Sequence, residues 1–242
     1  MNLPCSVFAP LVENPSNPWG IVARGPCHKP AVLLDAYYHG AFPWFSDQDQ
    51  FWFSPPQRCT LTPSDLHITK SFSKTLRNTK YEVRVLSTPN EVARVLHQCA
   101  SAPRPGSPPG TWLTPELQHH LCSMAGSVVV ALEVSSPTGA VLGGLYGLRI
   151  GALFCGESMF SLAPNGSKIA LAALCHQAQN LGIELIDCQQ ASPHLLAMGA
   201  QPLPRASYLR HLARLRPPQI TSMLQQPHWP DTLPPPLLQR TP

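Results

Sequence analysis

Polar side chains interrupt two apolar stretches of the sequence, and their types suit proton transfer or hydrogen bonding to a reacting group. Glu157 and Met159 lie in the segment LFCGESMF, and Asp187 and Gln189 lie in the segment IELIDCQ. Because side chains alternate between the faces of a strand, we expect Glu157 to share one face with Met159, and Asp187 to share one with Gln189. A carboxylate beside a methionine, facing an Asp-x-Gln pair, indicates a polar site set into an apolar pocket.

A helix is predicted between these two strands, and it has to position them. Its segment, residues 167–181, is nearly all apolar from Ile169 to Cys175, so we expect it to be buried against a sheet. Ser167 suits the N-cap of this helix and Gly182 its C′ position. Strands are predicted on both sides of the helix, which argues for a mixed α/β or α+β domain.

Capping and turn residues predict further elements along the chain. Residues 31–38 resemble a short helix that ends at Gly40. Thr114 is placed to cap another helix, with Pro115 at its first position. The segments VVVALEV and AVLGGLYGLRI are expected to form a hairpin through the turn SSPTG.

Proline-rich stretches indicate where the chain divides. The 29 prolines gather near the N-terminus, in residues 103–110 and after Arg216, which is typical of loops, linkers and tails. We therefore expect a small N-terminal domain over residues 1–60, a catalytic domain over residues 61–216 and a proline-rich tail over residues 217–242.

A group of cations marks the helix that is expected after Asp65. Lys70, Lys74, Arg77 and Lys80 follow one another at spacings of four, three and three residues, which places them on one flank of that helix. No acid interrupts the stripe. Two interpretations remain open: a solvated helix face, or a patch that contacts a phosphate backbone.

Composition limits the classes of protein. The net charge of +4 permits an anionic partner without demanding one. The eight cysteines form no CxxC pair and no zinc-ligand spacing, so no metal is expected and reduced thiols in the cytoplasm fit best. No apolar run reaches about 18 residues, and we expect neither a membrane span nor a signal peptide.

Aromatic side chains crowd the segment AFPWFSDQDQFWFS. Most of them are expected to pack under a loop, since aromatics mainly serve packing. A stacking platform for a nucleic-acid base is the alternative, and Trp44, which follows a proline, is its better candidate.

The motifs FPWF, GTW, FCGESMFS and LIDCQ, in this order, resemble those of the leucyl/phenylalanyl-tRNA–protein transferase family, from about Leu33 to Leu215. The resemblance implies an α+β fold: a small N-terminal domain and a mixed-sheet domain similar to the GCN5-related acetyltransferases. It implies transfer of Leu or Phe from aminoacyl-tRNA to proteins with N-terminal Arg or Lys, which marks them for degradation. An apolar slot that contains Met159 adapts to unbranched and aromatic side chains and adds Met as a further candidate. The resemblance implies no cofactor.

The resemblance also implies roles for residues outside the strands. Trp44 matches the tryptophan that stacks on the terminal adenine of the tRNA, and Trp112 matches an active-site tryptophan. Glu157 matches the glutamate that binds the basic N-terminal residue of the acceptor.

The same resemblance places Leu145, Met159 and Leu171 in the aminoacyl pocket, and Asp187 and Gln189 in a pair that assists catalysis. An amide oxygen is too weakly basic to act as a conventional base, so Gln189 is expected to accept a hydrogen bond from the attacking amine. Asp187 is expected to hold that amide in the right orientation. A proton route through the ribose 2′-OH remains open.

Several positions depart from the family pattern. Leu145 stands at a common methionine position, Leu162 where an arginine usually follows FCGESMFS, and Leu174 where an aromatic is often found. The alternatives are a diverged transferase that acts on a small molecule or another acceptor, an acyl-CoA enzyme, and a tRNA-binding module without activity. His194 is either a structural hydrogen-bonding residue or a catalyst.

Overall fold

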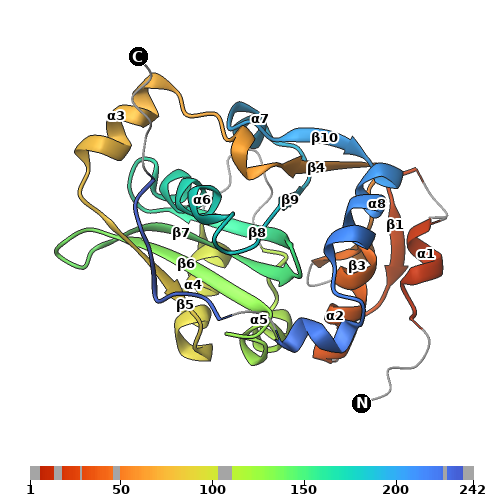
Figure 1. The fold of residues 1–242 in the computed structure, drawn as a ribbon. Coiled ribbons are helices and arrows are strands. Elements are labelled where there is room, and N and C mark those ends of the chain that lie inside the picture. The colour runs from red at the N-terminus through yellow and green to blue at the C-terminus, as the bar shows by residue number, and fades with distance from the viewer. Residues whose placement is uncertain are drawn as a thin grey trace.

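The computed structural model describes residues 6–13, 18–27, 29–45, 50–102, 111–225 and 228–236. In these residues the strands form a small and a large sheet (Figure 1). The small sheet has the order β1-β3-β2 and consists of β1 (Ile21–Arg24), β2 (Phe42–Phe45) and β3 (Gln50–Phe53). With α1 (Ala9–Glu13) and α2 (Pro30–His39) it makes up a small N-terminal unit.

The large sheet has the order β10-β4-β9-β8-β7-β6-β5-β11. Its strands are β4 (Gln57–Leu61), β5 (Glu82–Leu86), β6 (Val129–Ser135), β7 (Val141–Ile150), β8 (Leu153–Ser161), β9 (Leu185–Gln189), β10 (Gln201–Pro204) and β11 (Thr232–Leu233). β8 and β9 are parallel, and the other neighbours are antiparallel. The sheet is therefore mixed, and the predicted α+β class with a small N-terminal domain is confirmed.

Helices cover both faces of the large sheet (Figure 1). The remaining helical elements are η1 (Pro63–Asp65), α3 (Lys70–Asn78), α4 (Pro89–Ser101), α5 (Pro115–Ser123), α6 (Gly166–Gln177), α7 (Pro193–Ala197), α8 (Arg205–Leu215) and η2 (Ile220–Gln225). α6 packs on one face and α4 with α5 on the other, so alternate residues of β6 enter two separate apolar clusters. The cluster on the α4 side continues into the N-terminal unit.

The structure confirms the ends of two predicted helices. Gly40 ends α2 in the left-handed conformation (φ 89°), which a glycine adopts without a steric penalty. The Thr114 side chain accepts a hydrogen bond from the N–H of Leu117 and thereby caps α5. The predicted β6–β7 hairpin is also present.

The prediction that Ser167 caps α6 is wrong. Asn165 is the N-cap residue, and Ser167 lies in the first turn of the helix. The Ser161 side chain, from the end of β8, accepts a hydrogen bond from the N–H of Ser167 at 2.9 Å. A neighbouring strand thus supplies the acceptor that the prediction assigned to the helix itself.

Lys80 does not lie on the predicted helix. α3 ends at Asn78, and Thr79 has left the helical conformation. The stripe on α3 is therefore Lys70, Lys74 and Arg77, while Lys80 follows in the connection to β5.

A β-bulge at Glu157 breaks the simple alternation of β8. Tyr146 pairs with Ser158 but Gly147 pairs with Gly156, so Glu157 is an extra residue in the ladder. Met159 packs into the cluster on the α6 side, whereas Glu157 interacts with Tyr37 of the other cluster. The alternation that predicted a shared face for Glu157 and Met159 is therefore broken at the bulge, although both residues line the same cavity.

No helix in the described ranges combines the length and the apolar character that crossing a bilayer requires.

Candidate active site

A slot opens where the strands β8 and β9 separate. They pair only from Leu153 with Leu185 to Cys155 with Asp187. Beyond that point a cavity of about 170 Å³ lies between β7, β8, β9, α6 and α7. Its lining includes the three predicted pocket residues and Glu157, and these four side chains are Leu145, Met159, Leu171 and Glu157. The structure therefore brings the predicted pocket residues together with Glu157.

The slot is apolar and of moderate size. Leu174 and Ile186 add further apolar walls, and Ser192 and His194 line it from α7 and the residue before it. An apolar cavity of about 150 Å³ in another protein holds a benzene molecule. A slot of about 170 Å³ thus has room for a leucine or phenylalanine side chain.

Asp187 lies at the last residue pair between β8 and β9, and its carboxylate is fully hydrogen-bonded within the protein. Arg58 of β4 binds it through two parallel hydrogen bonds, Nε to Oδ1 at 2.8 Å and Nη2 to Oδ2 at 2.6 Å. The Tyr208 hydroxyl donates to Oδ2 at 2.8 Å, and the Gln189 N–H donates to Oδ1 at 2.8 Å. Asp187 has no exposed surface, so both its oxygens are satisfied by the protein.

The Arg58 guanidinium also has contacts on every side. It lies between the rings of Phe42 and Tyr208, 4.6 Å and 4.4 Å from their centroids, and it also donates to the carbonyl of Gly40. Burial acts to lower the pKa of Arg58, but Asp187 and Tyr208 overcome it and the pKa is raised. The pair is therefore ionised and joins β4, β9, α8 and the N-terminal unit at one point.

Gln189 joins this pair to Glu157. Its backbone is left-handed (φ 61°) and its N–H is bound to Asp187. Its side-chain Nε2 donates to Glu157 Oε1 at 2.5 Å. Asp187 thus fixes the backbone of Gln189, whereas the sequence predicted that it would hold the amide. The amide is oriented by Glu157 instead.

The two carboxylate oxygens of Glu157 are held unequally. Oε1 accepts a hydrogen bond from Gln189, while Oε2 is buried and has no hydrogen bond of good geometry, with the Tyr37 hydroxyl as its neighbour. Burial raises the pKa of Glu157 to about 8; the Tyr37 hydroxyl and Arg58 oppose the rise, and Asp187 adds to it. A carboxyl that holds its proton more tightly than usual therefore belongs to the lining of the slot.

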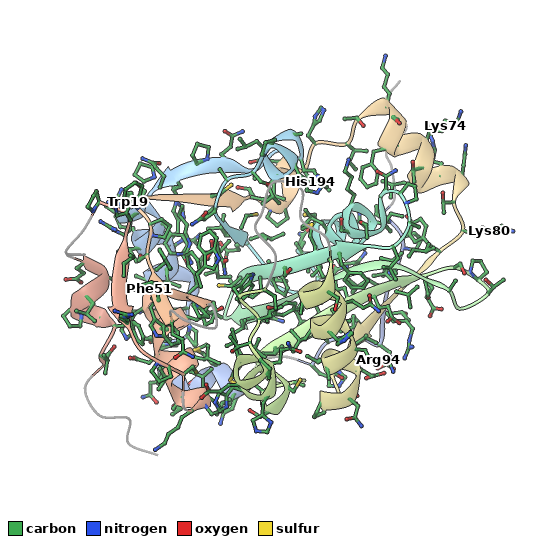
Figure 2. The ribbon with its side chains drawn as sticks, turned by 180° about the vertical axis from the view of Figure 1, so that it is seen from behind. Trp19, Phe51, Lys74, Lys80, Arg94 and His194 are labelled. Atoms are coloured by element: carbon green, nitrogen blue, oxygen red, sulfur yellow. The ribbon has the colours of Figure 1, made fainter. Side chains whose placement is uncertain are left out.

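Other predicted residues lie away from the slot. Trp44 is 45% exposed on β2, with its ring edge against Phe53 at 5.6 Å. Trp112 packs partly buried against the cluster on the α4 side. Neither tryptophan lines the slot. Figure 2 shows the Lys74 and Lys80 side chains extending outward from α3 and the chain after it.

The sequence did not reveal the roles of Arg58, Tyr208 and Tyr37. Arg58 lies near the start of the apolar strand β4, but its partner Asp187 is 129 residues away in the sequence. His194 lines the slot, and burial and then Lys168 lower its pKa.

Two further features concern ligands. The described residues contain no cluster of three or more His, Cys, Asp or Glu that would suit a metal ion. None of the cysteines in these residues forms a disulfide bond.

Known proteins match this chain over most of its length. The family model described as leucyl/phenylalanyl-tRNA protein transferase matches residues 60–213, and the model of that enzyme's N-terminal domain matches residues 29–56. A leucyl/phenylalanyl-tRNA–protein transferase of Thiobacillus denitrificans is 41% identical over 212 residues, which cover 87% of this chain and 90% of the relative. One from Xanthomonas campestris pv. campestris is 42% identical over 217 residues, or 87% and 83% of the two chains.

Solved structures resemble the chain less closely. L-PGS from Bacillus licheniformis matches with a TM-score of 0.39 and 14% identity over 59% of this chain and 49% of that one, which is too distant to support an argument. The sequence relatives and the family models agree with each other. The chain therefore belongs to the leucyl/phenylalanyl-tRNA–protein transferase family of aminoacyltransferases.

Proposed function

We propose that this protein transfers Leu or Phe from aminoacyl-tRNA to the α-amine of proteins that begin with Arg or Lys, and so marks them for degradation. The observation that supports this most is the apolar slot of about 170 Å³ with the hydrogen-bonded Glu157–Gln189 pair beside it. The aminoacyl side chain fills the slot between Leu145, Met159 and Leu171. The ester then lies next to the polar pair.

An aminoacyl-tRNA is already an activated ester, so the protein mainly has to align two reactants and accept one proton. Gln189 contacts the attacking amine through its amide oxygen, because its nitrogen is occupied by Glu157. Asp187 acts through Gln189, whose backbone it holds. Glu157 meets the N-terminal residue of the acceptor, through its cationic side chain or its amine.

The tRNA is bound by surfaces around the slot. Trp44 is exposed enough to stack on the terminal adenine, and Trp112 contributes a second aromatic wall. The basic stripe on α3 and the lysine that follows the helix make phosphate contacts. These cations are Lys70, Lys74 and Arg77 on α3 and Lys80 in the connection to β5. The free thiols support a cytoplasmic location.

The test is transfer of radiolabelled Leu from Leu-tRNA to a set of acceptors. The set contains peptides that begin with Arg, Lys or Ala, together with free amines of low mass. Label on the Arg and Lys peptides alone is the expected result. Label on the free amines alone would instead identify a transferase for small molecules, and no label on any acceptor would overturn the proposal.

A further inference from the structure

Glu157 and Asp187 differ in their capacity to take up a proton. Both oxygens of Asp187 accept hydrogen bonds, from Arg58, Tyr208 and the Gln189 backbone, and no part of its surface is exposed. A proton on Asp187 would leave the Arg58 charge buried without its counter-ion, which is costly. The Glu157 side chain lines the slot, and its Oε2 is buried with no hydrogen bond of good geometry; the neighbouring Tyr37 hydroxyl is the group that stabilises its charge.

Gln189 holds Glu157 in a defined position. Its Nε2 donates to Oε1 at 2.5 Å, and its own backbone is fixed by Asp187. The other carboxylate oxygen, Oε2, is left without a contact to Gln189 and is influenced by the Tyr37 hydroxyl. The Gln189 amide oxygen can accept a hydrogen bond, but it is far too weak a base to remove a proton from an amine.

We propose that Glu157 is the proton acceptor for the α-ammonium group of the incoming protein, and that Gln189 is the residue that positions it. The proposal rests on the proposed function, because it requires an amine acceptor and an ester donor. The proposed function lets Glu157 contact either the cationic side chain or the α-amine of the acceptor's first residue. The present proposal assigns the contact to the α-amine.

The Glu157 carboxylate takes one proton from the ammonium group, and the neutral amine forms a bond to the ester carbonyl carbon. The bond from that carbon to the ribose 3′ oxygen then breaks. The second proton leaves the nitrogen and ends on the 3′ oxygen, which departs as a hydroxyl. Glu157 returns its proton to solvent, so that each turnover releases one proton overall.

The surroundings of Glu157 suit this step. Burial raises its pKa to about 8, close to the value of about 7.7–8.0 for a free α-amine, so the transfer is nearly balanced in energy. An arriving ammonium group favours the carboxylate form. The titratable and charged groups that interact with Glu157 are Tyr37 of α2, Arg58 of β4, Cys155 of β8 and Asp187 of β9. Tyr146 of β7 and His194 of α7 line the same slot.

The experiment compares wild type with Glu157→Gln, in single turnovers of Leu transfer to a saturating Arg-starting peptide from pH 6.5 to 9. General-base catalysis contributes roughly 10²- to 10⁴-fold, so we expect at least a 100-fold loss in the variant at pH 7. The loss should shrink to within about tenfold at pH 9, where the amine is already neutral. A peptide whose N-terminal amine has an electron-withdrawing neighbour, and hence a pKa near 6, should restore the variant at pH 7.

Glu184→Gln is the matched control, because Glu184 forms only an exposed ion pair with Arg214 at 2.7 Å. Glu157→Asp keeps a carboxylate and should keep the wild-type shape of the pH profile; it also serves if Glu157→Gln does not fold. A loss that is the same at every pH, or a raised KM for Arg peptides with an unchanged saturating rate, overturns the proposal. A wild-type protein that labels no acceptor would instead mean that the proposed function has failed.

Discussion

Arg58 and Asp187 are 129 residues apart in the sequence and form a two-fold hydrogen-bonded ion pair, with N–O distances of 2.8 and 2.6 Å. Neither side chain is more than 1% exposed. The pair joins β4 to β9, and the Asp187 carboxylate also accepts a hydrogen bond from the backbone N–H of Gln189. The geometry of the slot therefore depends on a buried charge pair that is not part of its lining.

Removing one charge of this pair should destabilise the fold strongly. Asp187→Asn leaves Arg58 buried without a counter-ion, and we expect a loss of about 3–5 kcal/mol. For a chain of this length that lowers Tm by about 6–20 °C, measured by calorimetry or circular dichroism. Glu184→Gln breaks an exposed pair of the same type and should cost less than about 1 kcal/mol. Equal, small losses in the two variants would contradict the structural role of Asp187.

Shortening Met159 should alter amino-acid selection without abolishing transfer. Met159 lines the slot beside Leu145, so Met159→Ala enlarges it and should weaken discrimination among Leu, Phe and Met. The stability cost should be about 2–5 kcal/mol or less, because Met159 is only partly buried. Competition between the three aminoacyl-tRNAs measures the ranking. Met223→Ala, a buried methionine away from the slot, controls for lost packing, and an unchanged ranking in Met159→Ala would remove Met159 from the pocket.

The basic stripe should determine how tRNA binding responds to salt. Each phosphate contact that is lost should reduce the slope of log K against log salt by roughly 0.7–0.9. We expect this for Lys74→Ala, measured by filter binding from 50 to 200 mM salt. Arg94→Ala, an exposed cation on α4 (Figure 2), should leave the slope unchanged. If both variants behave like wild type, the stripe is a solvated face.

Glu157 should make stability depend on pH. Its folded-state pKa of about 8 lies above that of an unfolded glutamate, so the folded protein binds the proton more tightly. Its contribution is fully present below about pH 4.5 and is lost as pH rises towards 8. Glu157→Gln should therefore gain in Tm relative to wild type between pH 5 and pH 8.5. A difference in Tm that does not change with pH would show that Glu157 is already ionised in the folded protein.

Local signals in the sequence were sufficient for several elements of the fold. Gly40 and Thr114 determine their helix ends through their own backbone or side chain. Ser167 could not be placed in this way, because Ser161 reaches it from another strand. The bulge at Glu157 likewise depends on the register with β7, which alternation within one strand does not reveal.

The residues of the candidate site also divide into those that sequence motifs predict and those that depend on contacts between distant parts of the chain. The sequence motifs led to Leu145, Met159 and Leu171, and the structure places all three in one slot. Arg58 was missed because its importance depends on a contact with Asp187 that only the folded chain creates.

Gln189 has a φ of 61°, a conformation that costs a residue with a Cβ atom about 1–2 kcal/mol. Glycine adopts it without that penalty. Gln189→Gly should therefore be more stable than Gln189→Ala by about 1 kcal/mol, although both variants lose the amide and should lose kcat alike. The protein thus holds its site in a backbone conformation that stability alone would not select. The left-handed backbone at Gln189 costs stability, but it directs the side-chain amide towards Glu157, where the proposed function needs it.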